Sequence, residues 1–313
     1  MADMTYRPLG DSGLIVSAVG LGCNAFGTRI DAETAAVVVD AALEHGITLF
    51  DTADIYGYGE SEQLVGAALG TRRDEVAVAT KFGGDMKGTN GPDWGARGSR
   101  RYIRRAVEAS LRRLGTDWID LYQMHWPDPV TPIDETLAAL DELVTEGKVR
   151  YIGSSNFDGW QIVDADWVAR SSGFERFISA QNKYSLYDRT AEDELVPACE
   201  HVGVGILPYY PLEYGLLSGK YRRGEPAPAD SRLASRPALL DGADFDRIEA
   251  LERFAAERGV GVLDVAISGL VAQPAVASVI AGATRPEQVA ANVAALVWEP
   301  SASDLAALDE LTE

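Results

Sequence analysis

Short apolar segments alternate with amphipathic segments from residue 18 to the end of the chain. The apolar segments have the length of strands and are bounded by polar residues or glycine, which is typical of buried strands. We expect strands at residues 18–21, 47–50, 76–80, 119–124, 149–152, 177–181, 204–207 and 276–280.

The intervening segments repeat apolar residues every three or four positions, as amphipathic helices do. Three such stripes are Ala35, Val38, Val39 and Ala42; Ile103, Val107, Leu111 and Leu114; and Ile133, Leu137, Leu140 and Val144. Residues that favour helix caps stand near two helix starts, so we expect caps at Thr131 or Asp134 and at Ser61.

Ahead of this alternation, residues 6–9 and 14–17 flank the turn-forming residues 10–13, which predicts a β-hairpin. Eight strands alternating with helices over about 300 residues match a (β/α)8 TIM barrel, with the hairpin closing its bottom. A doubly wound sheet of two halves is the alternative. No linker rich in Pro, Gly or Ser divides the chain, so we expect a single domain over residues 1–313.

Two long segments follow predicted strands at the barrel face where active sites form. Residues 82–98 follow the third strand, and residues 213–243 follow the seventh and hold much of the Pro and Arg. Neither segment has a periodic pattern, so the sequence predicts no conformation for them.

The chain is strongly acidic. It has 313 residues with 28 Lys and Arg against 48 Asp and Glu, a formal net charge of −20. Such a surface repels nucleic acids and anionic lipids, so we expect neither as a partner. A phosphate-bearing cofactor would therefore need a local basic patch.

Cysteine and histidine are scarce. Cys23 and Cys199 lie far apart, and the three histidines do not cluster, so we expect neither a disulfide framework nor a metal site. The N-terminal residues lack a signal-type apolar stretch, and no apolar run approaches the roughly 20 residues of a membrane span. These features favour a cytoplasmic protein.

Residues 20–25 match the glycine pattern of a dinucleotide-binding turn after a strand. That fingerprint requires a helix to begin at once, so that the helix N-terminus faces the pyrophosphate. Here residues 26–29 intervene and the helical pattern begins only near Asp31. We therefore reject this interpretation.

Polar residues occupy the predicted carboxyl ends of neighbouring strands. Asp51 ends the second strand, Lys81 the third and His125 the fourth, while Tyr56 follows Asp51 on the next loop. Adjacent strands lie ~4.8 Å apart, so Asp51, Lys81 and His125 would be neighbours at one barrel mouth. Alternation along the strands then directs Ala77, Ala79, Leu121 and Gln123 inward and leaves Tyr122 and Met124 facing the helices.

This combination indicates proton transfer. A buried Lys81 beside a buried Asp51 would form an ion pair. The lysine charge would lower the pKa of Tyr56 from about 10 and make it a usable acid, and His125 could hydrogen-bond the phenol or a substrate oxygen. The set supplies no electrons, so we expect a hydride donor beside it.

Each of these residues alone is often structural. Lys81 alone is also compatible with a Schiff-base lyase, although a carboxylate partner keeps the amine protonated and non-nucleophilic. All four together, in chain order at matching strand ends, favour a catalytic set.

The segments that carry these residues resemble the aldo-keto reductase family over nearly the whole chain. The resembling motifs are residues 20–24, 51–57, 79–81, 123–126, 153–157, 181–184, 208–220 and 280–292. The resemblance implies that Asp51, Tyr56, Lys81 and His125 catalyse hydride transfer between NADP(H) and an aldehyde or ketone.

The resemblance also implies a set of cofactor-binding residues. They are Gly22, Cys23, Asp51, Ser154, Ser155, Asn156, Gln181, Tyr209, Pro211, Leu212, Gly215, Leu216, Ser218, Lys220, Gly282, Thr284, Arg285, Gln288 and Asn292. Gly282 would admit a phosphate near a helix N-terminus, and Arg285 would pair with the adenosine 2′-phosphate, which favours NADP(H) over NAD(H).

Three residues depart from the family pattern. Ala281 stands where many members have Pro, Tyr210 replaces a commoner Ser and could narrow the cofactor tunnel, and Glu213 places an acid near the expected pyrophosphate path. We expect Phe26, Tyr58, Trp94 and Trp126 in the wall of the substrate pocket.

The sequence leaves the substrate and the oligomeric state open, and we expect a monomer or a weak homo-oligomer. The fold also resembles the barrel β-subunits of potassium channels, in which cofactor binding would serve sensing. The acidic charge disfavours that second role.

Overall fold

The computed structural model describes residues 4–229 and 231–312, so the ends of the predicted domain and Asp230 of the segment 213–243 lie outside the described residues. The strands are β1 (Tyr6–Pro8), β2 (Ile15–Ser17), β3 (Val19–Gly22), β4 (Leu49–Asp51), β5 (Ala77–Phe82), β6 (Ile119–Met124), β7 (Val149–Ser155), β8 (Phe177–Gln181), β9 (Gly205–Ile206) and β10 (Val279–Gly282). The α-helices are α1 (Ala32–Glu44), α2 (Glu60–Leu69), α3 (Arg100–Leu114), α4 (Ile133–Thr145), α5 (Gly159–Ser172), α6 (Leu195–Val202), α7 (Pro237–Asp241), α8 (Phe245–Glu257), α9 (Val262–Val271), α10 (Pro286–Ala294) and α11 (Ala302–Thr312).

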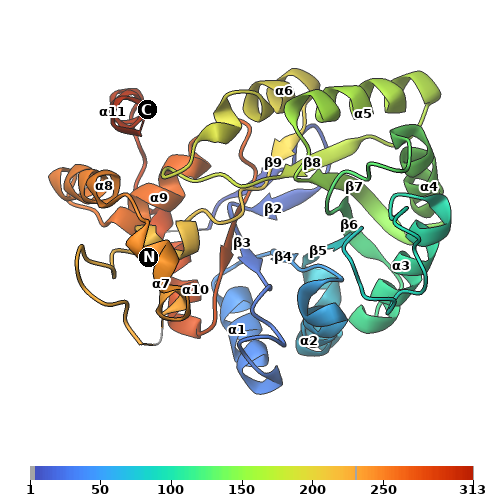
Figure 1. Ribbon diagram of the computed structural model, residues 1–313, viewed down its shortest axis with the longest axis horizontal. Helices are drawn as coiled ribbons and strands as arrows, with labels where there is room; N and C mark the ends of the chain where they lie inside the picture. Colours follow the sequence, from blue (N-terminus) through green and yellow to red (C-terminus); the bar gives the residue numbers. More distant parts are fainter. Residues whose placement is uncertain (1–3, 230, 313) are drawn as a thin grey trace.

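Eight parallel strands form the centre of the molecule, in the order β10-β3-β4-β5-β6-β7-β8-β9 (Figure 1). Backbone hydrogen bonds join the two ends of this order: Ile206 N donates to Ala275 O at 2.7 Å and Ile280 N donates to Pro208 O at 3.0 Å. The sheet is thus a (β/α)8 barrel, as predicted, and the doubly wound alternative is wrong.

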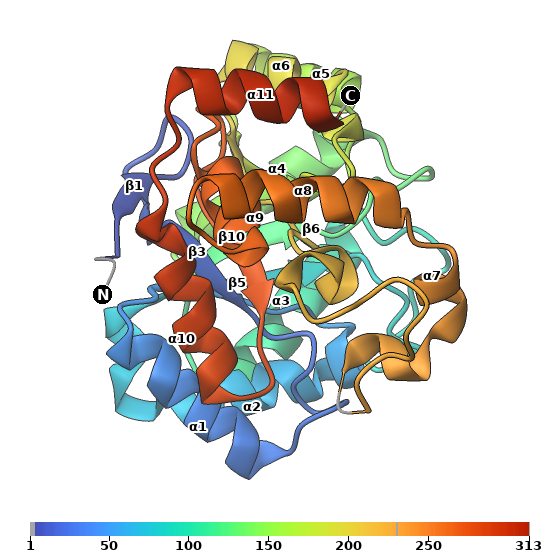
Figure 2. The same ribbon diagram turned by 90° about the vertical axis from the view of Figure 1, so that its left-hand side faces the viewer.

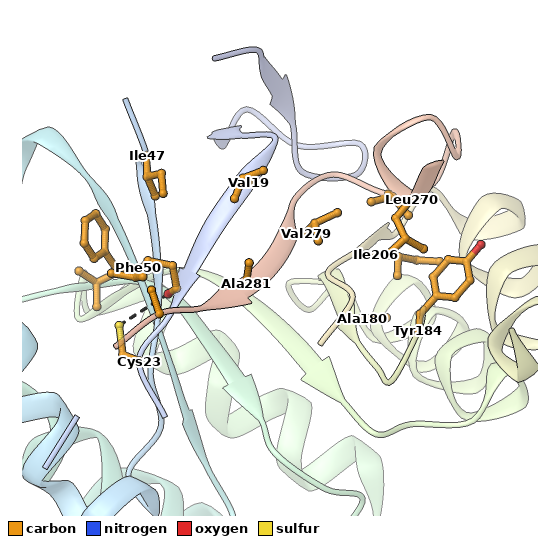
Figure 3. Packing of buried hydrophobic residues seen from close by; sticks show 14 of the residues in the cluster. Val19, Cys23, Ile47, Phe50, Ala180, Tyr184, Ile206, Leu270, Val279 and Ala281 are labelled. Carbon is orange, nitrogen blue, oxygen red and sulfur yellow. Dashed lines mark hydrogen bonds between the residues drawn. The ribbon is translucent and has the colours of Figure 1, made fainter. Parts of the chain in front are cut away.

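Helices surround the strands, and a large apolar core fills the space between the two layers. Figure 3 shows part of it, with Val19, Phe50, Val279 and Ala281 on neighbouring strands. Most residues of the three predicted helical stripes are buried in this core, which confirms the helix faces that the periodicity predicted.

A second apolar cluster fills the barrel interior. Leu9 and Val16 of the hairpin pack there with Leu49, Ala77 and Leu121 from the strands. The hairpin therefore closes the amino-terminal end of the barrel, as predicted. Its turn requires Gly10, because φ there is +57° and a Cβ would lie 2.6 Å from the Gly205 nitrogen.

Two predicted helix caps are wrong. Helix α4 begins after Pro132 without a side-chain cap, and the Thr131 hydroxyl instead donates to Asp128 Oδ2 at 2.7 Å. Ser61 lies inside α2 and donates to Cys23 O at 2.8 Å. Ser61 is thus held by a residue far away in the sequence, whereas Thr131 bonds within the loop that precedes α4, and neither hydroxyl takes the capping position that local spacing assigned to it.

The segment between β9 and α8 is a long irregular excursion that includes α7 (Figure 2). Within the described residues, no helix is both long and apolar enough to cross a membrane.

Candidate active site

The predicted catalytic residues gather at the carboxyl ends of β4, β5 and β6. Asp51 pairs in register with Ala79, and Lys81 pairs with Gln123. The predicted alternation is also confirmed, because Ala77, Ala79 and Leu121 lie in the interior cluster, while Tyr122 and Met124 lie in the outer core.

Lys81 and Asp51 form a fully buried ion pair. The Lys81 ammonium donates to Asp51 Oδ1 at 2.7 Å, to Asp51 Oδ2 at 2.8 Å and to the Thr52 carbonyl oxygen at 2.8 Å, so all three of its N–H groups have partners. The Gln181 amide also donates to Asp51 Oδ1 at 2.8 Å. This satisfied network stabilises both charges in the barrel interior.

Tyr56 lies on a short 3-10 helix, η1 (Tyr56–Gly59), directly above this pair. The Lys81 nitrogen is 5.3 Å from the centroid of the Tyr56 ring, which is cation–π distance. Burial and then the negative charge of Asp51 raise the pKa of Tyr56 well above its usual value. Burial and the Asp51 charge thus act against the lowering of the Tyr56 pKa that was expected from Lys81.

His125 lies beside Tyr56, with ring centroids 5.9 Å apart in an edge-on arrangement. Burial and then the Lys81 charge lower the pKa of His125 well below 6.5, so its imidazole is neutral near pH 7. Its Nδ1 is buried and has no hydrogen-bond partner among the described residues. A proton on Nδ1 would lack an acceptor, which favours the Nε2–H tautomer.

Tyr56 and His125 line a cavity of about 510 Å³ at the barrel mouth. Many residues predicted from the sequence line it with them: Gly22, Asp51, Trp126, Ser155, Asn156, Gln181, Tyr209, Pro211, Leu212, Gly215, Ser218, Lys220, Gly282, Thr284, Arg285, Gln288 and Asn292. The structure therefore brings residues from distant segments of the chain to one cavity.

Seven predicted residues do not line this cavity. Lys81, Cys23, Ser154 and Leu216 lie buried behind its wall. Of the predicted pocket aromatics, only Trp126 lies in the wall, where it stacks on His125 with ring centroids 3.7 Å apart.

The other three pocket aromatics lie elsewhere. Phe26 is buried in the outer core, and the Tyr58 side chain is exposed on η1. Trp94 is 68% exposed, and its ring centroid lies 4.3 Å from the guanidinium carbon of Arg101. The sequence identified their aromatic character but not the direction of their loops.

Other lining residues were not predicted. They are Asn24, Arg29, Tyr214, Arg232, Leu263, Ile280, Ala281 and Ala291. The signal for Arg232 was the arginine content of residues 213–243, whereas nothing in the local sequence distinguishes Arg29.

The lining is rich in positive charge. Arg29, Lys220, Arg232 and Arg285 all line the cavity, and within the described part of the chain no carboxylate forms an ion pair with Arg29, Lys220 or Arg232. Burial and then the charges of Arg232 and Arg236 lower the pKa of Arg29. The cavity therefore has the local positive charge that a phosphate-bearing cofactor was expected to need.

The segment around Arg285 has the geometry expected of a helix N-terminus. Arg285 is the N-cap residue of α10, and Pro286 is its first residue. The Gln288 Oε1 accepts from the Thr284 backbone N–H at 2.8 Å and from its hydroxyl at 3.1 Å. Gln288 thereby fixes the turn that leads from β10 into α10.

Glu213 does not lie in the cavity lining. It is 6% exposed, and its Oε1 lies 3.0 Å from the Lys183 ammonium. Tyr210 does line the cavity, and the guanidinium carbon of Arg232 lies 5.0 Å from its ring centroid.

A buried polar network supports the segment between Asp51 and Tyr56, and sequence reasoning missed it. Arg113 Nε donates to Glu62 Oε2 at 2.6 Å, and its NH1 donates to Asn90 Oδ1 at 3.0 Å. Asn90 donates in turn to Asp54 Oδ2 at 3.2 Å, and Thr80 donates to Glu62 Oε1 at 2.6 Å. Burial and the nearby Glu62 charge raise the pKa of Asp54 well above its usual value.

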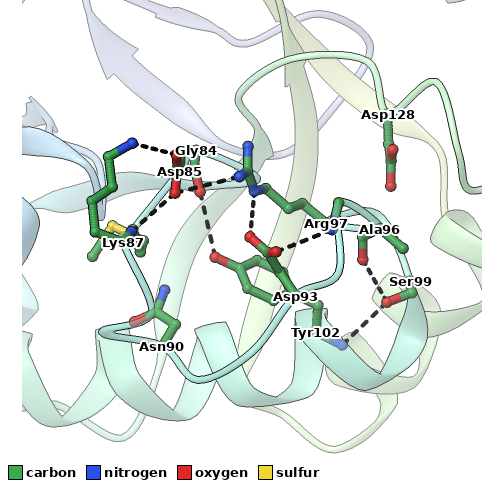
Figure 4. Close-up of polar contacts among 12 residues, drawn as sticks. Gly84, Asp85, Lys87, Asn90, Asp93, Ala96, Arg97, Ser99, Tyr102 and Asp128 are labelled. Atoms are coloured by element: carbon green, nitrogen blue, oxygen red, sulfur yellow. Dashed lines mark hydrogen bonds and ion pairs between the residues drawn. The ribbon is translucent and has the colours of Figure 1, made fainter.

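Asn90 belongs to the segment 82–98, whose contacts are shown in Figure 4. Arg97 donates to Asp93 at 2.6 Å and pairs with Asp85 at 3.3 Å, and the Tyr102 hydroxyl donates to Gly84 O at 3.4 Å. The segment is thus folded on itself and anchored to α3.

No group of three or more His, Cys, Asp or Glu side chains within residues 4–229 and 231–312 is arranged to hold a metal ion.

A closed barrel with its ionisable residues and its cavity at the carboxyl ends of the strands defines the class of TIM-barrel enzymes. A sequence model of the Aldo/keto reductase family matches residues 18–313, and the chain belongs to that family. It is therefore an oxidoreductase, of a family that uses nicotinamide cofactors and small carbonyl substrates.

Its relatives differ in their described roles. The chain is 40% identical over 301 residues to the uncharacterized oxidoreductase YrpG of Bacillus subtilis (strain 168), covering 94% of this chain and 91% of that one. It is 36% identical over 334 residues to an NADH-specific methylglyoxal reductase of Escherichia coli (strain K12), covering 99% of both. It is 35% identical over 305 residues to a probable voltage-gated potassium channel subunit beta of Oryza sativa subsp. japonica, covering 94% and 91%.

Proposed function

We propose that the protein reduces aldehydes or ketones with NADPH, with Tyr56 as the proton donor. The observation that carries this proposal is the shared cavity, in which Tyr56 and His125 stand over the buried Asp51–Lys81 pair while Lys220 and Arg285 line the same space. One cavity thus combines a proton donor with binding groups for a phosphorylated cofactor.

The lining residues fit a nicotinamide dinucleotide phosphate. Lys220 and Arg232 would hold the pyrophosphate, and Arg285 with the N-terminus of α10 would hold the 2′-phosphate. Tyr209 lines the cavity and is fixed by its hydroxyl, which donates to Asn156 Oδ1 at 2.7 Å, so its ring would offer a flat apolar face. The position of Arg285 favours NADP(H), although one relative is named as NADH-specific.

When bound, the reduced nicotinamide supplies a hydride to the carbonyl carbon. Tyr56 donates its proton to the carbonyl oxygen as negative charge develops there. Its raised pKa keeps the phenol protonated at neutral pH, so the site is set for reduction. Neutral His125 donates a hydrogen bond from Nε2 that orients the same oxygen.

The Asp51–Lys81 pair acts as a fixed platform. Its three short hydrogen bonds hold the Lys81 ammonium beneath the Tyr56 ring, where the cation stabilises negative charge that develops on the phenol. The same bonds leave Lys81 without a free lone pair or access to the cavity, which argues against a Schiff-base lyase.

A cofactor-sensing role remains the second candidate, because relatives named as potassium channel β-subunits cover most of the chain. The two functions differ in turnover. A reductase oxidises many equivalents of NADPH in the presence of a carbonyl compound, whereas a sensor binds NADPH without sustained oxidation.

The test follows NADPH absorbance while purified protein is offered a panel of aldehydes and ketones, with NADH in parallel. We expect sustained oxidation of NADPH with at least one short aldehyde, at a higher kcat/KM than with NADH. Tight NADPH binding with no oxidation across the panel would contradict the reductase function and favour the sensing role.

A further inference from the structure

Helix α5 carries apolar residues on two opposite faces. Ile162 and Ala165 point inward and are buried in the core between helices and strands. Trp160, Val163 and Trp167 point outward and are 60%, 37% and 69% exposed. A surface helix of a globular protein normally has one apolar stripe, which faces the core, so the second stripe needs a partner.

The outward stripe is contiguous. Its members are spaced three and four residues apart, which places them side by side along one helix face. Singly exposed apolar residues are ordinary, but two neighbouring tryptophans and a valine form a patch of the kind found in protein interfaces. Helix α5 lies at the periphery of the molecule in Figure 1. The exposure of the three side chains shows that the stripe faces solvent rather than the barrel.

We propose that this stripe is a homodimer interface, in which α5 of a second copy packs antiparallel with Trp167 near the two-fold axis. Charge complementarity selects a second copy. Asp164 precedes Trp167 by three residues, and Arg170 follows it by three. In an antiparallel pair centred on Trp167, Asp164 of one copy therefore lies opposite Arg170 of the other, and this contact forms twice about the axis.

Arg170 is available for this contact. Its Nε donates to Asp166 at 2.7 Å, its side chain is 55% exposed, and no other hydrogen bond holds its terminal nitrogens among the described residues. The partner's Asp164 would extend an existing ion pair. Trp160 at one end of the stripe would then meet the partner's chain beyond the end of α5, near Phe174, which is only partly buried.

Other occupants fit less well. The net charge of −20 disfavours an anionic membrane or a nucleic acid as the partner. The only arginine of α5 is Arg170, so no basic cluster stands beside the stripe on this helix. The same net charge sets the salt dependence of a dimer, because two acidic chains repel each other until salt screens them. The dimer should therefore strengthen as salt is raised, which is opposite to an interface built on ion pairs alone.

The experiment is sedimentation velocity of the full chain over a wide concentration range at low and high salt. We expect a reversible dimer for the unaltered protein. The double variant Trp160→Gln/Trp167→Gln should raise the dissociation constant at least ~30-fold, because buried tryptophans dominate interface energies. Val37→Gln, which alters an exposed valine on α1, is the matched control and should not change it.

A charge exchange tests the antiparallel arrangement. Asp164→Arg and Arg170→Glu should each weaken the dimer, and the double variant should restore it. Circular dichroism confirms that each variant is folded. A monomer at every concentration, or a dimer unchanged in Trp160→Gln/Trp167→Gln, would overturn the proposal. Failure of the double exchange to restore association would overturn the antiparallel arrangement.

Discussion

At the scale of single residues, the state of Tyr56 follows from its surroundings rather than from its own chemistry. Burial and the Asp51 charge oppose ionisation of the phenol, and the nearest cation, Lys81, is held in an ion pair with the same carboxylate. The proton is therefore retained until it is delivered to a stronger base, such as a developing alkoxide.

The pH dependence of reduction should reflect this state. A raised pKa means that Tyr56 keeps its proton as pH rises through 10, and a lowered pKa keeps His125 neutral down to well below pH 6.5. We expect kcat/KM for carbonyl reduction to be flat between about pH 6.5 and about pH 10. If kcat/KM instead decreases within that range, and the decrease is absent in His125→Gln, the titrating group is His125.

Arg285 should discriminate between the two nicotinamide cofactors. Charge-assisted hydrogen bonds contribute about 1.5–3 kcal/mol, so Arg285→Ala should weaken NADPH binding by roughly ten- to a hundred-fold. NADH binding should change little, and Arg285→Lys should retain part of the NADPH affinity. Fluorescence titration measures both dissociation constants, and an equal loss for both cofactors would place Arg285 away from the 2′-phosphate.

At the scale of elements, α2 and α3 are joined by a buried ion pair that supports the catalytic loop. Glu62 is fully buried and accepts from both Arg113 and Thr80. Glu62→Gln would leave the Arg113 charge without its partner, which we expect to lower the free energy of unfolding by about 3–5 kcal/mol.

Urea denaturation measures the free energy of unfolding of Glu62→Gln, and Arg104→Met is the control. Arg104 lies on α3, as Arg113 does, but its ion pairs are exposed. Such surface pairs contribute about 0–1 kcal/mol. Similar unfolding free energies for the two variants would show that the buried network does not stabilise the fold.

The elements themselves were predictable because each needed only local information. Apolar runs gave the strands of the barrel, and the alternation around His125 correctly oriented Leu121 and Tyr122. The predicted helix caps failed for two reasons: Ser61 bonds to the distant Cys23 carbonyl, and Thr131 bonds to Asp128 within its own loop. The spacing of residues along the chain shows that a hydroxyl is near a helix start, but not which neighbouring group it contacts.

The site residues that could be predicted from the sequence are those with a characteristic side chain at the end of a predicted strand. Asp51, Lys81 and His125 follow from that rule, whereas Arg29 and the Asp54–Asn90 contact depend on how long loops fold back. Trp94 shows the same limit, because its aromatic ring gave no sign that the segment 82–98 turns it toward Arg101 and solvent.

At the scale of the whole molecule, the two ends of the barrel have separate tasks. The hairpin fills the amino-terminal end with Leu9 and Val16, while the cavity occupies the carboxyl end. A mutation in the hairpin should therefore lower the free energy of unfolding without lowering the activity at the opposite end.

Leu9→Ala tests this separation. Leu9 is fully buried in the interior cluster, so its truncation should lower the free energy of unfolding by about 2–5 kcal/mol and leave the NADPH dissociation constant within two-fold of the unaltered protein. Ile15, which lies on the hairpin and is 52% exposed, provides the control. Ile15→Ala should change neither the free energy of unfolding nor the NADPH dissociation constant. A large loss of NADPH affinity in folded Leu9→Ala would show that the two ends are coupled.

The proposed function depends on Tyr56 delivering the proton during carbonyl reduction. The most direct measurement compares steady-state turnover of Tyr56→Phe with that of the unaltered protein, together with NADPH binding by fluorescence titration. We expect turnover to fall at least about a hundred-fold, the usual contribution of a positioned general acid, while the NADPH dissociation constant stays near its original value. Turnover that survives in Tyr56→Phe with NADPH binding intact would show that another group delivers the proton.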